Sequence, residues 1–254
     1  MTSTITVRSG DHVPARLPVL RSEWLKIRTL RSLCWALFAV LAVSTAFSWL
    51  SGNSGTSEPE FDPLFTALSG VVPGQVAAIS FGATAVSSEF HGGGLRISLA
   101  AVPRRGRWFA AKATAIAVPV LAVGLVTGAA GLAAARSGLG AAANGLTWGE
   151  QARGVVGFGV YVMLMALLAA GLTVLLRSGV AALSVLIPFI LITSFVIGDM
   201  AGAVTDFLPD KAGQVVLQET SEGHLGPWSG LAVTALWTAA VLLAGAWSVR
   251  RRDA

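Results

Sequence analysis

Charged residues are scarce in this sequence. Only 12% of the 254 residues are Asp, Glu, Lys or Arg, and 54% are hydrophobic, whereas an ordinary soluble domain has about 25% charged residues. The scarcity is concentrated in six stretches of 21 to 27 residues that contain no charge at all. Stretches of this length are too long for ordinary core helices, so the composition argues against a water-soluble globular protein.

Several chemistries are excluded by what is missing. Cys34 is the single cysteine, which rules out an intramolecular disulfide and a cysteine metal cluster. None of the three lysines follows a glycine, so the phosphate-binding loop GxxxxGK[ST] is absent. The uncharged stretches provide no acid or base for catalysis or proton coupling at membrane depth. We therefore expect no enzyme activity and no bound cofactor in this chain.

The uncharged stretches predict an all-α membrane protein. About 20 apolar residues in a helix cross a hydrocarbon core roughly 30 Å thick, and each stretch meets that length. We expect six transmembrane helices, at approximately 32–51, 68–88, 112–135, 154–176, 178–198 and 228–249. Because a single short connection around Arg177 joins the fourth and fifth spans, those two spans should form an antiparallel hairpin.

The distribution of positive charge predicts the orientation. Fifteen of the 18 Lys and Arg residues fall in segments 1–31, 89–112, 177 and 250–254, which six spans place on one side. The positive-inside rule makes that side cytoplasmic, so both termini should be cytoplasmic in a multi-pass protein of the cell membrane. These basic strips face anionic lipid head groups, and we expect no nucleic-acid binding.

The remaining segments complete the predicted organisation. Residues 1–16 lack periodicity and are expected to be a disordered cytoplasmic tail, followed by one transmembrane domain over 17–254. In 17–31, Leu17, Leu20, Trp24 and Ile27 recur at helical spacing, which favours an interfacial helix over a merely charged flank to the first span. The outer segment 199–227 is expected to contain short helices that dip toward the membrane between the fifth and sixth spans.

Small residues suggest where helices pack. Glycines crowd the third span at 124, 128 and 131 and the fourth span at 154, 157 and 159. Small residues let helix backbones approach closely in lipid, so these faces should meet other helices, within the subunit or across a dimer.

Two cytoplasmic strips carry a family resemblance. The run RSEWLKIRTLRS (21–32) precedes the first span, and SSEFHGGGLRISLAAVPRRGRWFAAK (87–112) joins the second and third. Together with the ending WSVRRRDA, they resemble the permeases of type-2 ABC transporters of the actinobacterial type. In this family the first strip is an interfacial connecting helix and the second contains a cytoplasmic coupling helix that docks on a separate ATPase.

The resemblance implies roles for particular residues. The interfacial helix would use Glu23, Trp24, Lys26, Arg28 and Arg31. The ATPase-coupling segment, continuing to Lys112, would use Glu89, Phe90, Gly94, Arg96, Leu99, Pro103, Arg104 and Arg105. Without the resemblance, this loop could simply carry arginines that set the topology.

The resemblance also implies the partners. A cytoplasmic ABC ATPase subunit would bind ATP and Mg²⁺, and a second permease subunit, identical or paralogous, would complete the path within membrane lipids. We therefore expect the permease subunit of an ATP-driven exporter of an apolar or amphipathic cargo, with export favoured over import by analogy alone. A membrane sensor or scaffold of the same fold and a nucleotide-independent carrier or pore remain as alternatives.

Overall fold

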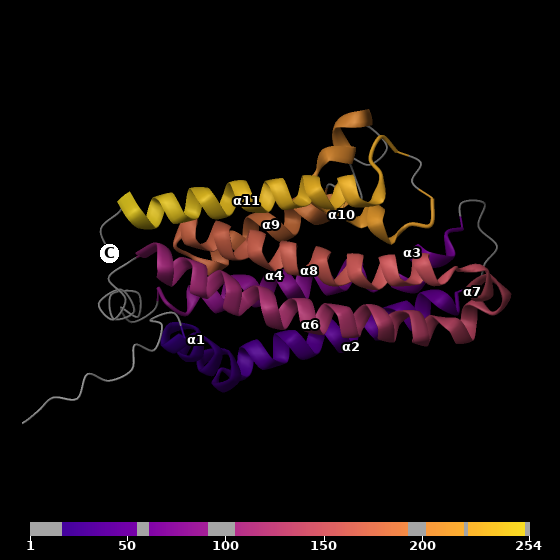
Figure 1. Cartoon of the computed structure of the whole chain (residues 1–254), viewed down its shortest axis with the longest axis horizontal. Helices are drawn as coiled ribbons and strands as arrows, with labels where there is room; N and C mark the ends of the chain where they lie inside the picture. Colours follow the sequence, from indigo (N-terminus) through magenta and orange to yellow (C-terminus); the bar gives the residue numbers. More distant parts are fainter. Residues whose placement is uncertain (1–16, 55–60, 91–104, 193–201, 221–222, 252–254) are drawn as a thin grey trace, which may run out of the picture.

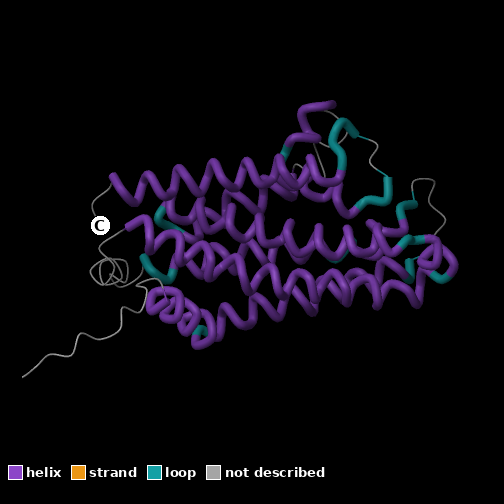
Figure 2. Tube along the Cα trace, in the orientation of Figure 1, coloured by secondary structure: helices purple, strands orange, loops and turns teal. Residues whose placement is uncertain are grey.

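The chain forms an elongated helical bundle in the computed structural model (Figure 1). The structure describes residues 17–54, 61–90, 105–192, 202–220 and 223–251. Every regular element among these residues is a helix, as the purple tube of Figure 2 shows. The predicted all-α class is therefore confirmed, whereas the expected tail over 1–16 lies outside the described residues.

Five helical segments are long and apolar enough to cross a membrane, which identifies a multi-pass membrane protein. They are α2 (Arg31–Gly52), α3 with α4 (Pro63–Leu68 and Val71–Ser87), α6 (Arg105–Leu139), α8 (Trp148–Leu176) and α11 (Pro227–Arg251). These segments coincide with five of the six predicted spans. The helix α6 begins seven residues before the predicted third span, so the basic strip 105–112 is already helical.

The predicted fifth span is shorter than expected in the described residues. The helix α9 (Gly179–Ile192) is apolar but has 14 residues, which gives it a length of about 21 Å, less than a typical hydrocarbon core. The remainder of that predicted span, 193–198, lies outside the described residues, so six spans stay a prediction. The expected hairpin is present, because α8 ends at Leu176 and Arg177 turns the chain with φ of 53° before α9 begins.

The helix α8 lies at the centre of the bundle. In its most apolar stretch 72% of residues are buried, against 22% for α2 and 28% for α11. A Cβ on Gly124 of α6 would lie 2.8 Å from the Cα of Gly159, and one on Gly128 would lie 3.2 Å from the Cα of Val155. Gly124, Gly128 and Gly159 thus pack α6 against α8 within the subunit, whereas the predicted glycines at 131, 154 and 157 meet α2, α3 and η4.

The two ends of the bundle differ. At the end that we call the α1 end, α1 (Leu17–Thr29) lies across the bundle and joins α2 through Leu30. The opposite end, called the α3 end, carries α3, α7 (Ala141–Gly145), η3 (Gly202–Phe207), α10 (Pro209–Gln214) and η4 (Val215–Leu217). Short helices are thus present between α9 and α11, whereas their position on the outer side, dipping toward the membrane, stays a prediction.

Exposed tryptophans mark both ends of the bundle. Trp24, Trp35 and Trp247 are exposed toward the α1 end, and Trp49, Trp148 and Trp228 toward the α3 end. Tryptophan favours the boundary between lipid and water because its ring is apolar and its N–H is polar. At the α1 end, the Arg251 guanidinium lies 4.5 Å from the centre of the Trp247 ring, where a cation–π contact forms. This placement agrees with helices that run from one membrane face to the other.

Candidate functional site: a buried ion cluster at the α1 end

Two acids and two lysines from three separate segments meet at the α1 end. Glu23 and Lys26 belong to α1, Glu89 follows the last turn of α4, and Lys112 lies in the second turn of α6. Glu23, Glu89 and Lys112 are buried, whereas the side chain of Lys26 is 40% exposed. We call these four residues the ion cluster.

The four side chains form a closed ring of ion pairs. Lys112 Nζ donates to Glu23 Oε2 at 2.7 Å and to Glu89 Oε1 at 2.8 Å. Lys26 Nζ donates to Glu23 Oε1 at 3.0 Å and to the same Oε1 of Glu89 at 2.8 Å. Each acid therefore meets two ammonium groups and each lysine meets two carboxylates, which compensates the burial of charge.

The local sequence places these groups. An acid and a base three residues apart share one face of a helix, so Glu23 and Lys26 both reach toward the bundle from α1. Ile27 on that side is 7% exposed and joins the core, whereas Trp24 is 40% exposed. Lys26 and Ile27, adjacent in the sequence, thus both lie on the side of α1 that faces the bundle. Charge pairing with Glu89, besides apolar periodicity, decides which face of α1 packs inward.

The cluster shifts the ionisation of its members. Burial alone would raise the pKa of Glu89, but the charge of Lys112 and the hydrogen bonds from both lysines outweigh it and lower that pKa to about 2. Burial would likewise lower the pKa of Lys26, but its hydrogen bonds to Glu89 and Glu23 raise it above the usual value. Both groups are consequently charged at neutral pH.

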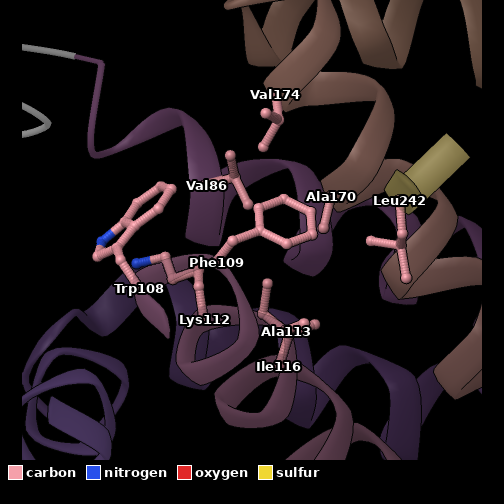
Figure 3. Close-up of a pocket in the computed structure, with 9 residues that line it drawn as sticks. All are labelled: Val86, Trp108, Phe109, Lys112, Ala113, Ile116, Ala170, Val174 and Leu242. Carbon is pink, nitrogen blue, oxygen red and sulfur yellow. The ribbon is translucent and has the colours of Figure 1, made fainter. Parts of the chain in front are cut away.

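The surroundings of the cluster on the bundle side are apolar. A pocket between α4, α6, α8 and α11 is lined by Val86, Trp108, Phe109, Lys112, Ala113, Ile116, Ala170, Val174 and Leu242. In Figure 3 the Phe109 ring points toward Ala170, whereas Lys112 extends to the same side as the Trp108 ring. Trp108 is 1% exposed and its indole N–H has no hydrogen-bond partner. These apolar walls exclude water, which strengthens the ion pairs.

The structure brings together only some of the predicted site residues. Glu23, Lys26 and Glu89 form the cluster, and Phe90 is half-buried against the core. Arg28 and Arg31 are exposed, and Arg105 is the first residue of α6. The remaining coupling residues lie outside the described part of the chain: Gly94, Arg96, Leu99, Pro103 and Arg104.

A second polar group, at the α3 end, was not predicted. Tyr161 of α8 donates a hydrogen bond to Gln75 Oε1 of α4, and Gln214 Nε2 of α10 lies 3.3 Å from the Tyr161 hydroxyl and 3.5 Å from Gln75 Oε1. All three residues are buried. Tyr161 is the only tyrosine in the chain. A phenol buried in an apolar helix needs a hydrogen-bond partner, so a single tyrosine within a predicted span is a sequence signal that could have indicated this group.

Among the described residues, no group of three or more His, Cys, Asp or Glu could hold a metal ion. The ion cluster connects α1, the end of α4 and the start of α6. No protein-family profile matches the chain, and no curated protein matches it.

Proposed function

We propose that this chain is the membrane-spanning permease subunit of an ATP-driven exporter of the ABC type. The ion cluster is the observation that carries the proposal. It connects the end of α4, at Ser87, to the start of α6, at Arg105, and these two helix ends flank the segment expected to touch an ATPase. It also connects both helix ends to α1. A force applied between those helix ends would reach α1, α4 and α6 together.

The second support is the chemistry of the sequence. The chain has no phosphate-binding loop, so an ATP-driven function requires a separate subunit that binds ATP and Mg²⁺. Basic residues gather in the sequence segments next to the helix ends of the α1 end, and the positive-inside rule supports a cytoplasmic location for that end. The proposed ATPase, also cytoplasmic, would then dock at the α1 end in the cell membrane.

A second permease subunit belongs to the proposal. Only 22% and 28% of the residues in the apolar stretches of α2 and α11 are buried, against 72% in α8. An apolar groove on the α2 side is lined by Phe38, Leu41, Ala42, Thr45, Ala46, Trp49, Ala130 and Ala134. Lipid and a second permease subunit, identical or paralogous, would cover these faces, and an apolar or amphipathic cargo would move along the path between the subunits.

Co-purification with a soluble ATPase tests the proposal. The full chain is expressed together with candidate ABC ATPases and purified in mild detergent, and the bound ATPase and its turnover are measured. Glu89→Ala combined with Arg96→Ala should reduce ATPase recovery while the protein stays in the membrane. The control is Asp206→Ala with Arg136→Ala, one acid and one base at the α3 end, which should leave recovery unchanged.

Two results would contradict the proposal. One is failure to recover any ATPase with the unmodified chain. The other is cargo movement by the isolated chain in vesicles that contain no nucleotide, which would favour a carrier or pore. ATPase binding without any cargo movement would instead favour a sensor or scaffold of the same fold.

A further inference from the structure

The short helices at the α3 end fill a gap between two long helices. Nearer the α1 end, α8 and α11 touch directly: a Cβ on Gly171 would lie 3.0 Å from Val241 Cγ1, and Thr238 Oγ1 lies 3.3 Å from the Leu164 carbonyl oxygen. Toward the α3 end, α10 lies between them. A Cβ on Gly213 would collide with the Tyr161 ring of α8 and lie 2.8 Å from Thr234 Oγ1 of α11.

Residues 209–217, which we call the plug segment, are deeply buried despite a polar sequence. In α10 the buried residues are Pro209, Asp210, Ala212, Gly213 and Gln214, and Val216 and Leu217 of η4 are 0% exposed. Gly213 allows the approach, because any side chain there would collide with Tyr161 of α8 and press against Thr234 of α11. The segment therefore occupies volume that would otherwise open to the α3 end.

The two ends of the plug segment are attached to different helices. Thr234 Oγ1 of α11 donates to the Pro209 carbonyl oxygen at 2.8 Å, next to the Trp237 Nε1 bond to the Phe207 carbonyl oxygen at 3.0 Å. The other end contacts α8 and α4 through Gln214, and directly after it Arg153 Nη2 of α8 donates to the Gln218 carbonyl oxygen at 2.6 Å. Movement of the plug segment together with α11 would preserve the first attachment and break the second.

The Gln214 attachment is the easier one to break. Its two hydrogen bonds, at 3.3 and 3.5 Å, are long. When Gln214 leaves, Tyr161 and Gln75 stay hydrogen-bonded to each other, so neither buried side chain loses its last partner. Departure of Gln214 therefore avoids most of the cost of an unsatisfied buried polar group.

We propose that the plug segment is a removable closure between α8 and α11, and that the Gln75–Tyr161–Gln214 group is a latch that holds it shut together with the Arg153 bond to Gln218. Release would open a space from the α3 end that reaches the Tyr161 hydroxyl and the Gln75 amide. This closure is a property of the bundle itself and does not depend on an ATPase partner.

Cysteine labelling of the full chain in lipid nanodiscs tests the latch. Cys34→Ser removes the native thiol, and Val216→Cys places a reporter in the plug segment. Adding Tyr161→Phe should raise the rate of reaction with a membrane-impermeant maleimide about three- to tenfold, because one hydrogen bond is lost from the closed form alone. The Tyr161–Gln75 hydrogen bond is present in the closed and in the open form. Its loss in Tyr161→Phe therefore does not change the equilibrium between the two forms.

Two controls make the result decisive. Thr173→Val removes a buried hydroxyl of α8 that bonds to the Ala169 carbonyl oxygen of its own helix, and it should leave the labelling rate unchanged. A separate reporter, Met165→Cys, lies at a fully buried position of α8 and should stay unlabelled in every background. Equal rates in Tyr161→Phe and Thr173→Val, or a joint rise at 216 and 165, would overturn the proposal.

Discussion

Lys112 of α6 and Glu23 of α1 form a buried ion pair, with 2.7 Å between Nζ and Oε2, although 89 residues separate them in the sequence. Glu89 shares the same lysine, so one ammonium group joins α1, α4 and α6. The helix α1 is therefore attached to the bundle by charge as well as by the packing of Ile27.

Breaking this pair should destabilise the protein in a non-additive way. Glu23→Gln and Lys112→Met should each cost about 1–3 kcal/mol, because each leaves charged partners less compensated in a buried site. The double variant should cost less than the two single costs combined, by about 0.5–3 kcal/mol, since the residues interact directly. The apparent melting temperatures in detergent of the unmodified protein, the two single variants and the double variant give the stability differences of this double-mutant cycle.

The matched control for that cycle is an exposed ion pair. Asp206 Oδ2 lies 3.2 Å from His224 Nδ1, and the two side chains are 36% and 71% exposed. Asp206→Asn should change stability by about 0–1 kcal/mol, as is typical of surface pairs. Strict additivity in the Glu23 and Lys112 cycle would mean that the two side chains do not interact.

Acid should weaken the ion cluster. The pKa of Glu89 is lowered from 4.5 to about 2 in the folded chain, so its contribution to stability is complete above pH 4.5 and is lost as pH falls toward 2. The raised pKa of Lys26 keeps that lysine charged throughout this range. The apparent melting temperature should therefore fall between pH 4.5 and 2, and Glu89→Gln should reduce the slope. An unchanged slope in Glu89→Gln would assign the acid sensitivity to other groups.

Contact between α4 and α8 depends on a glycine. A Cβ on Gly82 would collide with the carbonyl oxygen of Ala166, which belongs to helix backbone and cannot rotate away. Gly82→Ala should therefore cost about 1–3 kcal/mol, which corresponds to a fall in melting temperature of roughly 2–4 °C per kcal/mol.

A glycine without neighbours provides the comparison. A Cβ on Gly145, in the short helix α7, meets nothing within 4 Å. Gly145→Ala should be neutral or slightly stabilising, because alanine restricts the unfolded chain more than glycine does. Equal melting temperatures for Gly82→Ala and Gly145→Ala would show that α4 and α8 are not packed as described.

The sequence predicts the long helices well because hydrocarbon thickness sets a minimum uncharged length, and charge-free stretches are visible without any tertiary information. Five spans and the helix at 17–29 follow from that rule and from periodicity. The partners of Glu23 could not be derived in the same way. Periodicity assigns faces to a single helix, whereas the Lys112 pair arises from contact between helices distant in sequence.

The burial of α10 was also difficult to predict in detail. Its sequence, PDKAGQ, is typical of a surface turn because it combines proline, charge and glycine. It is nevertheless buried, because Ala212 and Gly213 permit close approach and Gln214 finds polar partners on α4 and α8. Neither the small residues nor the glutamine identifies a buried segment until Tyr161 is known to lie beside them.

The most direct test of the central claim is site-specific photo-crosslinking in native membranes that also contain the candidate ATPase. A photoreactive amino acid replaces Phe90, next to the ion cluster, or Trp148, which is 83% exposed at the α3 end. The account predicts a crosslink to the ATPase from position 90 and none from position 148. Crosslinking from 148 alone, or from neither position while the ATPase is present and folded, would contradict it.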